Sequence, residues 1–596
     1  MGHTVRALIF LIALASCSWA EPILRVIPPP GATFAPGQRF DVRIEGDDLL
    51  GQPLQFTVEV NGRDQRREIF GTEEFKIFPA SQGGRGATRS TVLNGGLIRR
   101  NWSLERPGKY EIKATLTIAD GRRLTATSTI EVENLQPSPN RARNVILFVG
   151  DGMGLAQRTA ARIVSKGVEG GRARGLLEMD QMETVGLVMT PSLDSLITDS
   201  SPGASAWATG NKSINAWHGV FPDNTGPVGN VAGLDRNPQA AAPFLDNPRV
   251  ENIAEFLQRT RRMSTGVVST VAVTDSTPGA FSSHSVRYAQ TAIAEQMLSS
   301  GHSVILGGGA RYFLPAGNPI LGNIVSSRAD SRNLVEEFKT AGFTFVSTAA
   351  DLERAGRAEK LLGLFHGAEM ASRYDRNRAK QGHSSGKIAV GQFPDQPTLE
   401  LMTQMAITVL GRNTNGFFLM VEAGSIDREL HRMDPNRAID EVIELDKAIG
   451  VARAWAAERG RDDTLILVTA DHETSGLILT GVNEKGRPSG RSFPNYQDAN
   501  FDGFPDSFQP ELALTYDFAS SFNPSRDARI YDLPRNLRDL NPSATPPPPT
   551  PGGGGQAGHS AVDVPISARG PGAALFGGVQ DNTHIFFKIL RALGDR

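Results

Sequence analysis

The first part of the chain carries short runs in which apolar and polar residues alternate. The clearest runs span residues 40–44, 54–60 and 110–118. Turn pairs such as Asn61-Gly62 and Pro107-Gly108 separate them, and such pairs commonly join antiparallel strands. Alternation of this kind is typical of strands that bury one face. Residues 21–136 therefore predict a small all-β domain, an immunoglobulin-like sandwich.

A different pattern begins after a Pro-containing linker at residues 137–142. Short continuous apolar runs now alternate with helix-like stretches, at residues 145–149, 266–268, 303–306, 417–421 and 465–468. Strands buried on both faces of a parallel sheet have this character. Residues 143–596 therefore predict an α/β domain whose large, mostly parallel central sheet is flanked by helices. Within it, residues 484–558 form a polar insert rich in Pro and Gly, a composition that does not build a core.

The N-terminus has the organisation of a secretory signal peptide over residues 1–20. Arg6 precedes an apolar run, and Ser18-Trp19-Ala20 supplies a small-x-small cleavage site. A second interpretation stays open, because Leu14-Ala15-Ser16-Cys17 resembles a bacterial lipobox that would anchor the protein to lipid through Cys17. Both predict an exported protein, periplasmic or extracellular. No later stretch is long and apolar enough for a transmembrane helix.

Charge and cysteine content exclude several classes of function. Lys plus Arg total 62 and Asp plus Glu total 64, a formal net charge of −2. That balance gives no basic footprint for nucleic acid. Cys17 is the single cysteine, which excludes a disulfide within the chain and a thiolate metal cluster.

Several of the predicted parallel strands run directly into residues that can bind metal. Asp151 follows the first strand, Glu422 follows the run at 417–421, and Asp471-His472 follows the last one. In open α/β sheets, sites form beyond the carboxyl ends of the strands. One such acid is usually a helix cap, but the convergence of three strands favours a site.

Two further positions extend this set of metal-binding candidates. Asp427 and His431 are four residues apart and share one face if the segment is helical. His559 lies just after the Gly-rich insert, where it is either an exposed loop residue or a ligand. Mixed carboxylate and imidazole sets suit Zn²⁺, whereas sets of oxygen ligands suit Mg²⁺.

A candidate nucleophile lies in the segment at residues 197–207, which is predicted to be a loop that enters a helix. Pro202 fits the first helical turn, and Ser200 or Ser201 fits the N-cap. In one interpretation these serines only cap the helix. In the other, the helix N-terminus binds a phosphate and a metal-activated serine attacks it.

Six motifs in this order resemble the alkaline phosphatase family. They are Asp151-Gly-Met-Gly, Thr198-Asp199-Ser200, Thr277-Pro278 with His284, Glu422-Ala-Gly-Ser-Ile-Asp427 with His431, Thr469-Ala470-Asp471-His472, and His559 with Ala568-Arg569-Gly570. The resemblance covers residues 143–596 and leaves out the β domain. It implies an α/β enzyme that hydrolyses small phosphate monoesters.

The resemblance also implies a role for each of these residues. Ser200 would attack phosphorus and form a phosphoserine. Two Zn²⁺ ions would be bound, one by Asp427, His431 and His559, and one by Asp151, Asp471, His472 and Ser200. One Mg²⁺ would be bound by Asp151, Thr277 and Glu422.

Three charged residues would complete the site in the same resemblance. Arg287 would bind two phosphate oxygens bidentately, although it follows His284 by three residues where the family usually has four. Asp275 and Arg428 occupy two positions that vary within the family. They would tune Mg²⁺ affinity and the release of phosphate, or form a plain salt bridge.

The polar insert contains one more pattern of possible ligands. Oxygen-bearing side chains fall at positions 1, 3, 5 and 9 of a calcium-loop pattern, at Asp498, Asn500, Asp502 and Asp506. Gln509 replaces the Glu that would complete the loop. A Ca²⁺ site and a plain acidic turn both stay open.

The leading hypothesis is thus an exported phosphomonoesterase with two Zn²⁺ and one Mg²⁺. The alternatives are a phosphodiesterase or sulfatase on the same metal core, and an exported binding protein without enzymatic activity. Thr277 and Glu422 disfavour the diesterase and sulfatase, because the resemblance links the third metal to monoester cleavage. Family members are often homodimers, and two interpretations stay open: a homodimer, or an interface that the extra β domain blocks or replaces.

Overall fold

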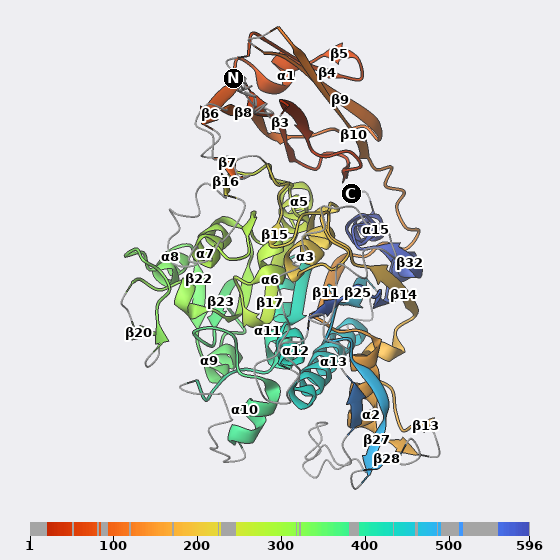
Figure 1. Ribbon diagram of the computed structural model, residues 1–596. Helices are drawn as coiled ribbons and strands as arrows, with labels where there is room; N and C mark the ends of the chain where they lie inside the picture. The colour runs from red at the N-terminus through yellow and green to blue at the C-terminus, as the bar shows by residue number, and fades with distance from the viewer. Residues whose placement is uncertain are drawn as a thin grey trace, which may run out of the picture.

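The structure is a computed structural model, and two parts are visible in it (Figure 1). An N-terminal β part lies above a larger α/β part. The residues described are 21–49, 53–79, 83–84, 93–118, 121–169, 172–223, 226–227, 246–316, 319–320, 324–380, 393–432, 434–458, 463–484, 487–489, 512–515 and 558–594.

The N-terminal part consists of two sheets around one core. One sheet has the order β1 (Ile23–Ile27), β3 (Phe40–Leu49), β8 (Leu93–Trp102) and β6 (Lys76–Pro79). The other has the order β2 (Thr33–Phe34), β10 (Arg123–Val132), β9 (Gly108–Thr117), β4 (Gln55–Val60) and β5 (Arg63–Asp64). The three runs singled out by alternation are the strands β3, β4 and β9. The part is not purely β, because it includes the short helix α1 (Arg66–Phe70).

The α/β part is built on one ten-stranded sheet. In sheet order its strands are β22 (Phe343–Val346), β23 (Lys360–Leu364), β19 (Val304–Gly308), β17 (Ser264–Ala272), β24 (Phe417–Ala423), β11 (Asn144–Gly150), β25 (Thr464–Thr469), β31 (Val564–Arg569), β14 (Thr184–Met189) and β32 (Gly578–Asp581). All neighbours are parallel except β31, which is antiparallel to both β25 and β14. The predicted fold, a large and mostly parallel sheet with helices, is confirmed. The single reversed strand was not predicted.

The centre of the sheet explains the continuous apolar runs. Every residue of β11, β24 and β25 is buried. Helices cover the sheet, among them α2 (Leu155–Lys166), α3 (Ser200–Thr209), α11 (Leu399–Leu410) and α13 (Pro435–Glu458). Because both faces of these strands are buried, polar side chains are disfavoured within them and appear only at the strand ends.

The two parts share a core at their junction. Phe221 and Val250 of the α/β part belong to the hydrophobic cluster of the β part. The backbone of Phe40 forms an isolated bridge with Val250, and Gln38 Nε2 donates to the carbonyl oxygens of Thr209 and Glu251, each at 2.9 Å. The β part is thus joined to the α/β part by both apolar packing and buried hydrogen bonds.

Candidate active site

Strand register brings the predicted acids to one edge of the sheet. Val149 of β11 lies opposite Glu422 of β24 on one side and Thr469 of β25 on the other. Asp151 and Asp471 each follow two residues later along these strands. The convergence predicted from the strand ends is therefore present.

The candidate nucleophile begins the buried helix α3. Ser200 is the first residue of this helix, and its N-cap is Asp199, whose Oδ1 accepts from Ser201 N at 2.7 Å. The prediction that Ser200 or Ser201 is the cap was wrong, because the carboxylate of Asp199 takes that role. Capping by the preceding residue leaves the Ser200 hydroxyl free to face the acids. Its Oγ lies 3.5 Å from Asp151 Oδ2 and 3.3 Å from His472 Nε2.

Asp427, His431 and His559 form the first group of converging donor atoms. Asp427 and His431 lie on α12 (Ser425–His431), and His559 lies on the short strand β30 (His559–Ser560). The two Nε2 atoms are 3.1 Å apart, and they lie 3.3 and 3.5 Å from the Asp427 carboxylate. Two tetrahedral ligands at about 2.05 Å from a zinc ion would be about 3.3 Å apart. The spacing of this group therefore fits Zn²⁺.

A second group surrounds Ser200. His472 Nε2 lies 3.6 Å from Asp151 Oδ1 and 3.1 Å from Asp471 Oδ2. Both carboxylate oxygens are buried and have no hydrogen-bond partner. Donor atoms of Asp151, His472 and Asp427 also lie within 4.8 Å of one another, so Asp427 stands between the two groups. Buried oxygens without donors are where a cation fits, since an unsatisfied buried acceptor is costly.

Glu422 and Thr277, the other two predicted Mg²⁺ ligands, are both buried. Thr277, on the short helix α6 (Ser276–Ala280), has a buried Oγ1 without a hydrogen-bond partner. Glu422 Oε2 accepts from Ser269 Oγ at 2.5 Å. This all-oxygen set is of the type that Mg²⁺ prefers.

The electrostatics of the site favour a cation. Burial raises the pKa of Asp151 well above its usual range, and the charges of Asp471 and Asp427 raise it further. Burial also raises the pKa of Glu422 to about 8. Among the described residues, no Lys or Arg forms an ion pair with either carboxylate. A divalent cation bound beside these carboxylates would lower both pKa values and favour the ionised forms.

The histidine side of the site behaves differently. Burial alone would raise the pKa of Asp427, but hydrogen bonds with His431 and His559 hold it well below its usual range. Burial likewise acts against a charged His559, but Asp427 raises its pKa to about 9. His559 Nδ1 also contacts the carbonyl oxygen of Thr198 at 2.8 Å, which leaves Nε2 to face the site.

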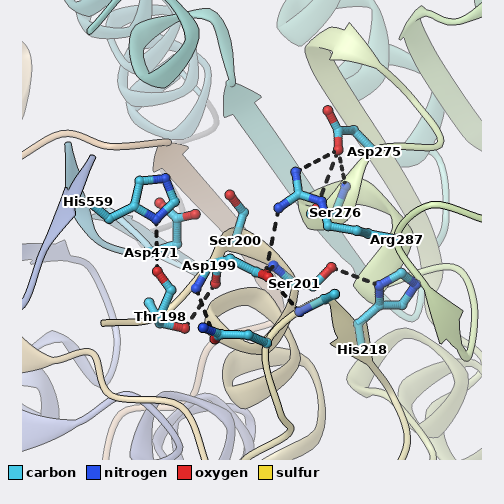
Figure 2. Close-up of polar contacts among 12 residues, drawn as sticks. Thr198, Asp199, Ser200, Ser201, His218, Asp275, Ser276, Arg287, Asp471 and His559 are labelled. Atoms are coloured by element: carbon cyan, nitrogen blue, oxygen red, sulfur yellow. Dashed lines mark hydrogen bonds and ion pairs between the residues drawn. The ribbon is translucent and has the colours of Figure 1, made fainter. Parts of the chain in front are cut away.

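Arg287 lies beside the start of α3 (Figure 2). Its Nη2 is 3.2 Å from Asp275 Oδ1 and its Nη1 is 3.6 Å from Asp199 Oδ1. The two acids orient the guanidinium from both sides. The shorter spacing from His284 therefore does not carry Arg287 away from Ser200.

Asp275 and Arg428 form an ion pair at this place. Arg428 Nη2 contacts Asp275 Oδ2, and its Nη1 lies 2.8 Å from Glu369 Oε1. Burial opposes ionisation of Asp275, but Arg428 and Arg287 lower its pKa to about 2. The salt-bridge interpretation of these two positions is thus present in the structure, next to Arg287.

Sequence reasoning missed several polar residues that hold these groups. Thr474 Oγ1 donates to Asp427 Oδ1 and lies 3.2 Å from His472 Nδ1, so it touches both donor groups. Ser269 and Glu369 were also not singled out. Of these three residues, only Thr474 could have been found from the sequence, because it lies two residues after His472.

Some predicted sites lie outside the described residues. These are the signal peptide with Cys17, and the candidate calcium ligands Asp498, Asn500, Asp502 and Asp506. In the part of the chain that the structure describes, no helix has the length and apolar character to cross a membrane.

The fold is thus an α/β sheet whose strand ends gather a serine and two groups of converging donor atoms of the kind that bind metal. The chain belongs to the alkaline phosphatase family, whose model matches residues 142–594. It is therefore an enzyme of the phosphomonoesterase class.

Individual relatives agree with this assignment. The alkaline phosphatase of Escherichia fergusonii is 27% identical over 80% of this chain and 92% of its own. The streptomycin-6-phosphate phosphatase of Streptomyces griseus is 28% identical over 78% of this chain and 93% of its own.

Solved structures agree as well. The alkaline phosphatase of the Antarctic bacterium TAB5 is 26% identical, covers 77% of this chain and 99% of its own, and has a TM-score of 0.53. A variant of that enzyme, in which a His is replaced by Asp, has Mg bound in its M3 site (26% identical, 77% and 99% coverage, TM-score 0.52).

Proposed function

We propose that this enzyme is an exported alkaline phosphatase that cleaves phosphate monoesters through a phosphoserine at Ser200. The observation that carries the proposal is the place of the Ser200 hydroxyl. It begins α3 and lies 3.3–3.5 Å from donor atoms of His472 and Asp151. A phosphoryl group bound there would meet the backbone N–H groups of the helix N-terminus.

The residues present fit two Zn²⁺ ions and one Mg²⁺ ion. Asp427, His431 and His559 would hold one Zn²⁺, and Asp151, Asp471, His472 and Ser200 the other. Asp151, Thr277 and Glu422 would hold Mg²⁺. When bound, such ions lower the pKa of an attacking hydroxyl or water and neutralise charge on the transferring phosphoryl group.

The chain's own groups then carry the chemistry. Ser200 Oγ gives its proton to solvent and forms a bond to phosphorus as the bond from phosphorus to the ester oxygen breaks, and the alcohol leaves with a proton from solvent. Water later cleaves the bond between phosphorus and Oγ, which releases phosphate and restores the hydroxyl. Arg287, held between Asp199 and Asp275, would bind two phosphoryl oxygens in both steps.

The remaining parts of the chain have supporting roles in this proposal. Residues 1–20 direct export, with or without lipid on Cys17. Residues 21–136 form an accessory domain joined by the linker at 137–142 to the catalytic domain at 143–596. Residues 484–558 are an insert in the catalytic domain.

Trapping of the intermediate tests the proposal directly. Zinc-loaded enzyme is incubated with a labelled aryl phosphate, quenched in acid and digested, and the labelled peptide is sequenced. Label is expected on Ser200 in the parent and in Ser201→Ala, and none is expected in Ser200→Ala. Label on Ser201, or turnover that survives in Ser200→Ala, would contradict the proposed nucleophile.

Matched substrates test the reaction class. The aryl phosphate monoester is expected to be hydrolysed far faster than the corresponding diester or sulfate at alkaline pH, with all turnover lost on chelation. A preference for the diester or the sulfate would overturn the proposed substrate class but would leave the family assignment unchanged.

A further inference from the structure

One short segment, residues 216–221, touches both the candidate nucleophile's helix and the loop of Arg287. Ala216 N donates to Asp199 Oδ2, and Ala216 O accepts from Arg287 N at 2.8 Å. The strand β15 (Trp217–His218) pairs antiparallel with β18 (Ser285–Val286), which ends directly before Arg287. We call residues 216–221 the bridging segment.

The other end of the bridging segment is anchored to the N-terminal β part. Phe221 is only 2% exposed and belongs to the core of that part. Backbone bonds of 2.8 and 2.9 Å join Phe221 N to Pro248 O and Val250 N to Gly219 O. Apolar packing of Phe221 against the β part, and backbone bonds to residues 248 and 250 of the α/β part, therefore hold this end of the bridging segment.

His218 is the side chain that connects this segment to the site. It is fully buried, with Nδ1 3.3 Å from Ser201 Oγ and Nε2 3.0 Å from Ser283 Oγ. Figure 2 shows its ring directed at Ser201, beside the start of the helix. Ser201 follows the candidate nucleophile, and Ser283 stands four residues before Arg287.

The ring also fills a space against α6. A Cβ added at Gly279 of that helix would lie 3.2 Å from His218 Cε1. Thr277 belongs to the same helix. One imidazole thus contacts α3, α6 and the loop that leads to Arg287, and no smaller side chain would span all three.

We propose that His218 is a positioning residue that sets the distance between Ser200 and Arg287. The inference rests on the proposed function, because it takes Ser200 as nucleophile and Arg287 as phosphate ligand. Loss of the ring would let the helix start and the arginine loop move apart. A displacement of about 1 Å in a site of this kind lowers turnover by about 100-fold.

His302 offers a matched control. It is also fully enclosed, with Nδ1 2.8 Å from Thr265 Oγ1 and Nε2 3.1 Å from Ser282 Oγ. Its serine partner is the neighbour of Ser283, but the hydrogen bonds of its ring go to Thr265, Ser282 and the Phe281 carbonyl oxygen, and none of these residues belongs to α3. His218→Leu and His302→Leu should therefore destabilise the fold to a similar extent.

The experiment compares these variants in the full-length, metal-loaded enzyme, by thermal unfolding, zinc content, kcat, KM and inhibition by inorganic phosphate. His218→Leu is expected to keep its zinc, to lose about 10- to 100-fold in kcat/KM, and to bind phosphate at least five-fold more weakly. His302→Leu is expected to keep kcat and phosphate inhibition near parent values. Equal losses in both variants, or a loss of zinc that accounts for the activity, would overturn the proposal.

Conservative variants keep the test valid if His218→Leu does not fold. Asn places a polar atom near the position of Nδ1, and Gln near that of Nε2. His218→Asn is expected to recover more activity than His218→Gln, because it keeps the contact with Ser201. Ser283→Ala is expected to lower kcat/KM by only two- to five-fold. If none of these variants lowers activity, the proposed role of His218 is overturned. Activity in Ser200→Ala would instead overturn the proposed function.

Discussion

Asp151 and Asp180, which lie before and after the helix α2, differ in how their negative charge is balanced: Asp151 is buried, and Asp180 is half-buried. Asp180 lies beside α2, and its carboxylate receives Nε of Arg158 at 2.8 Å and Nε of Arg162 at 2.5 Å. Burial opposes its ionisation, but the two arginines lower its pKa. Asp151, just before α2, has a raised pKa and an oxygen without a partner.

The difference separates a carboxylate that is paired within the chain from one that binds metal in the proposed function. Asp180 carries its counter-charges in the chain, so it is complete once the protein folds. Asp151, Asp471 and Glu422 lie together where a cation from outside the chain would complete them. A fold that left such acids unpaired without need would lose stability.

Removal of metal should give the largest effect. It should change the environment of Asp151, Asp471 and Glu422 but not that of Asp180. Extensive dialysis against a chelator is expected to lower kcat by about 1000-fold or more and to lower Tm, because ligands that bind only the folded state stabilise it. Zinc and magnesium added back should restore both, and metal analysis gives the stoichiometry. Full activity in metal-free protein would refute the distinction between the two aspartates.

Substitution of Arg287 tests the same contrast with a positive charge that the chain itself supplies near Ser200. Arg287→Ala is expected to lower kcat/KM by about 100-fold and to weaken inhibition by phosphate, since one bidentate partner of the phosphoryl group is lost. Steady-state kinetics with phosphate as inhibitor measure both. Arg287→Lys should recover only a small part, because lysine cannot bind bidentately. Unchanged phosphate inhibition in the alanine variant would rule out this role.

Asp180 should show the opposite profile from the site acids. Asp180→Asn leaves Arg158 and Arg162 without their carboxylate, at a cost of about 3 kcal/mol in the free energy of unfolding. Denaturant titration measures this loss. Turnover per folded molecule and zinc content should match the parent. A variant that is stable but inactive would show that Asp180 belongs functionally with Asp151.

The smallest effect is expected at the junction of the two parts, where His284 and Glu255 line a cavity of about 460 Å³. His284 Nε2 lies 3.1 Å from Glu255, which raises the pKa of His284 despite burial, while the same pair lowers the pKa of Glu255. A raised histidine pKa contributes stability below about pH 6.5 that is lost as pH rises through the folded value.

His284→Gln should therefore cost about 1.5 kcal/mol at pH 6 and less at pH 10. The pH dependence of denaturant unfolding in parent and variant measures this. Glu255 stays ionised across that range, so it does not reverse the sign. A cost that grows with pH would contradict the pairing.

Much of the fold was readable from the sequence, for identifiable reasons. Residues 145–149, 417–421 and 465–468 are short continuous apolar runs, as expected of strands buried on both faces. The antiparallel strand β31 was not readable, because strand direction depends on the sheet neighbours and leaves no mark on residues 564–569.

For the site, the sequence by itself determined the donor types and the acids at strand ends, because Asp151, Glu422 and Asp471 follow apolar runs within three residues. Only the tertiary structure decided which residues hold them. Asp199 rather than a serine caps α3, Thr474 joins two donor groups, and His218 reaches Ser201 from 17 residues away. These partners meet through packing between distant elements, and such contacts have no local pattern in the chain.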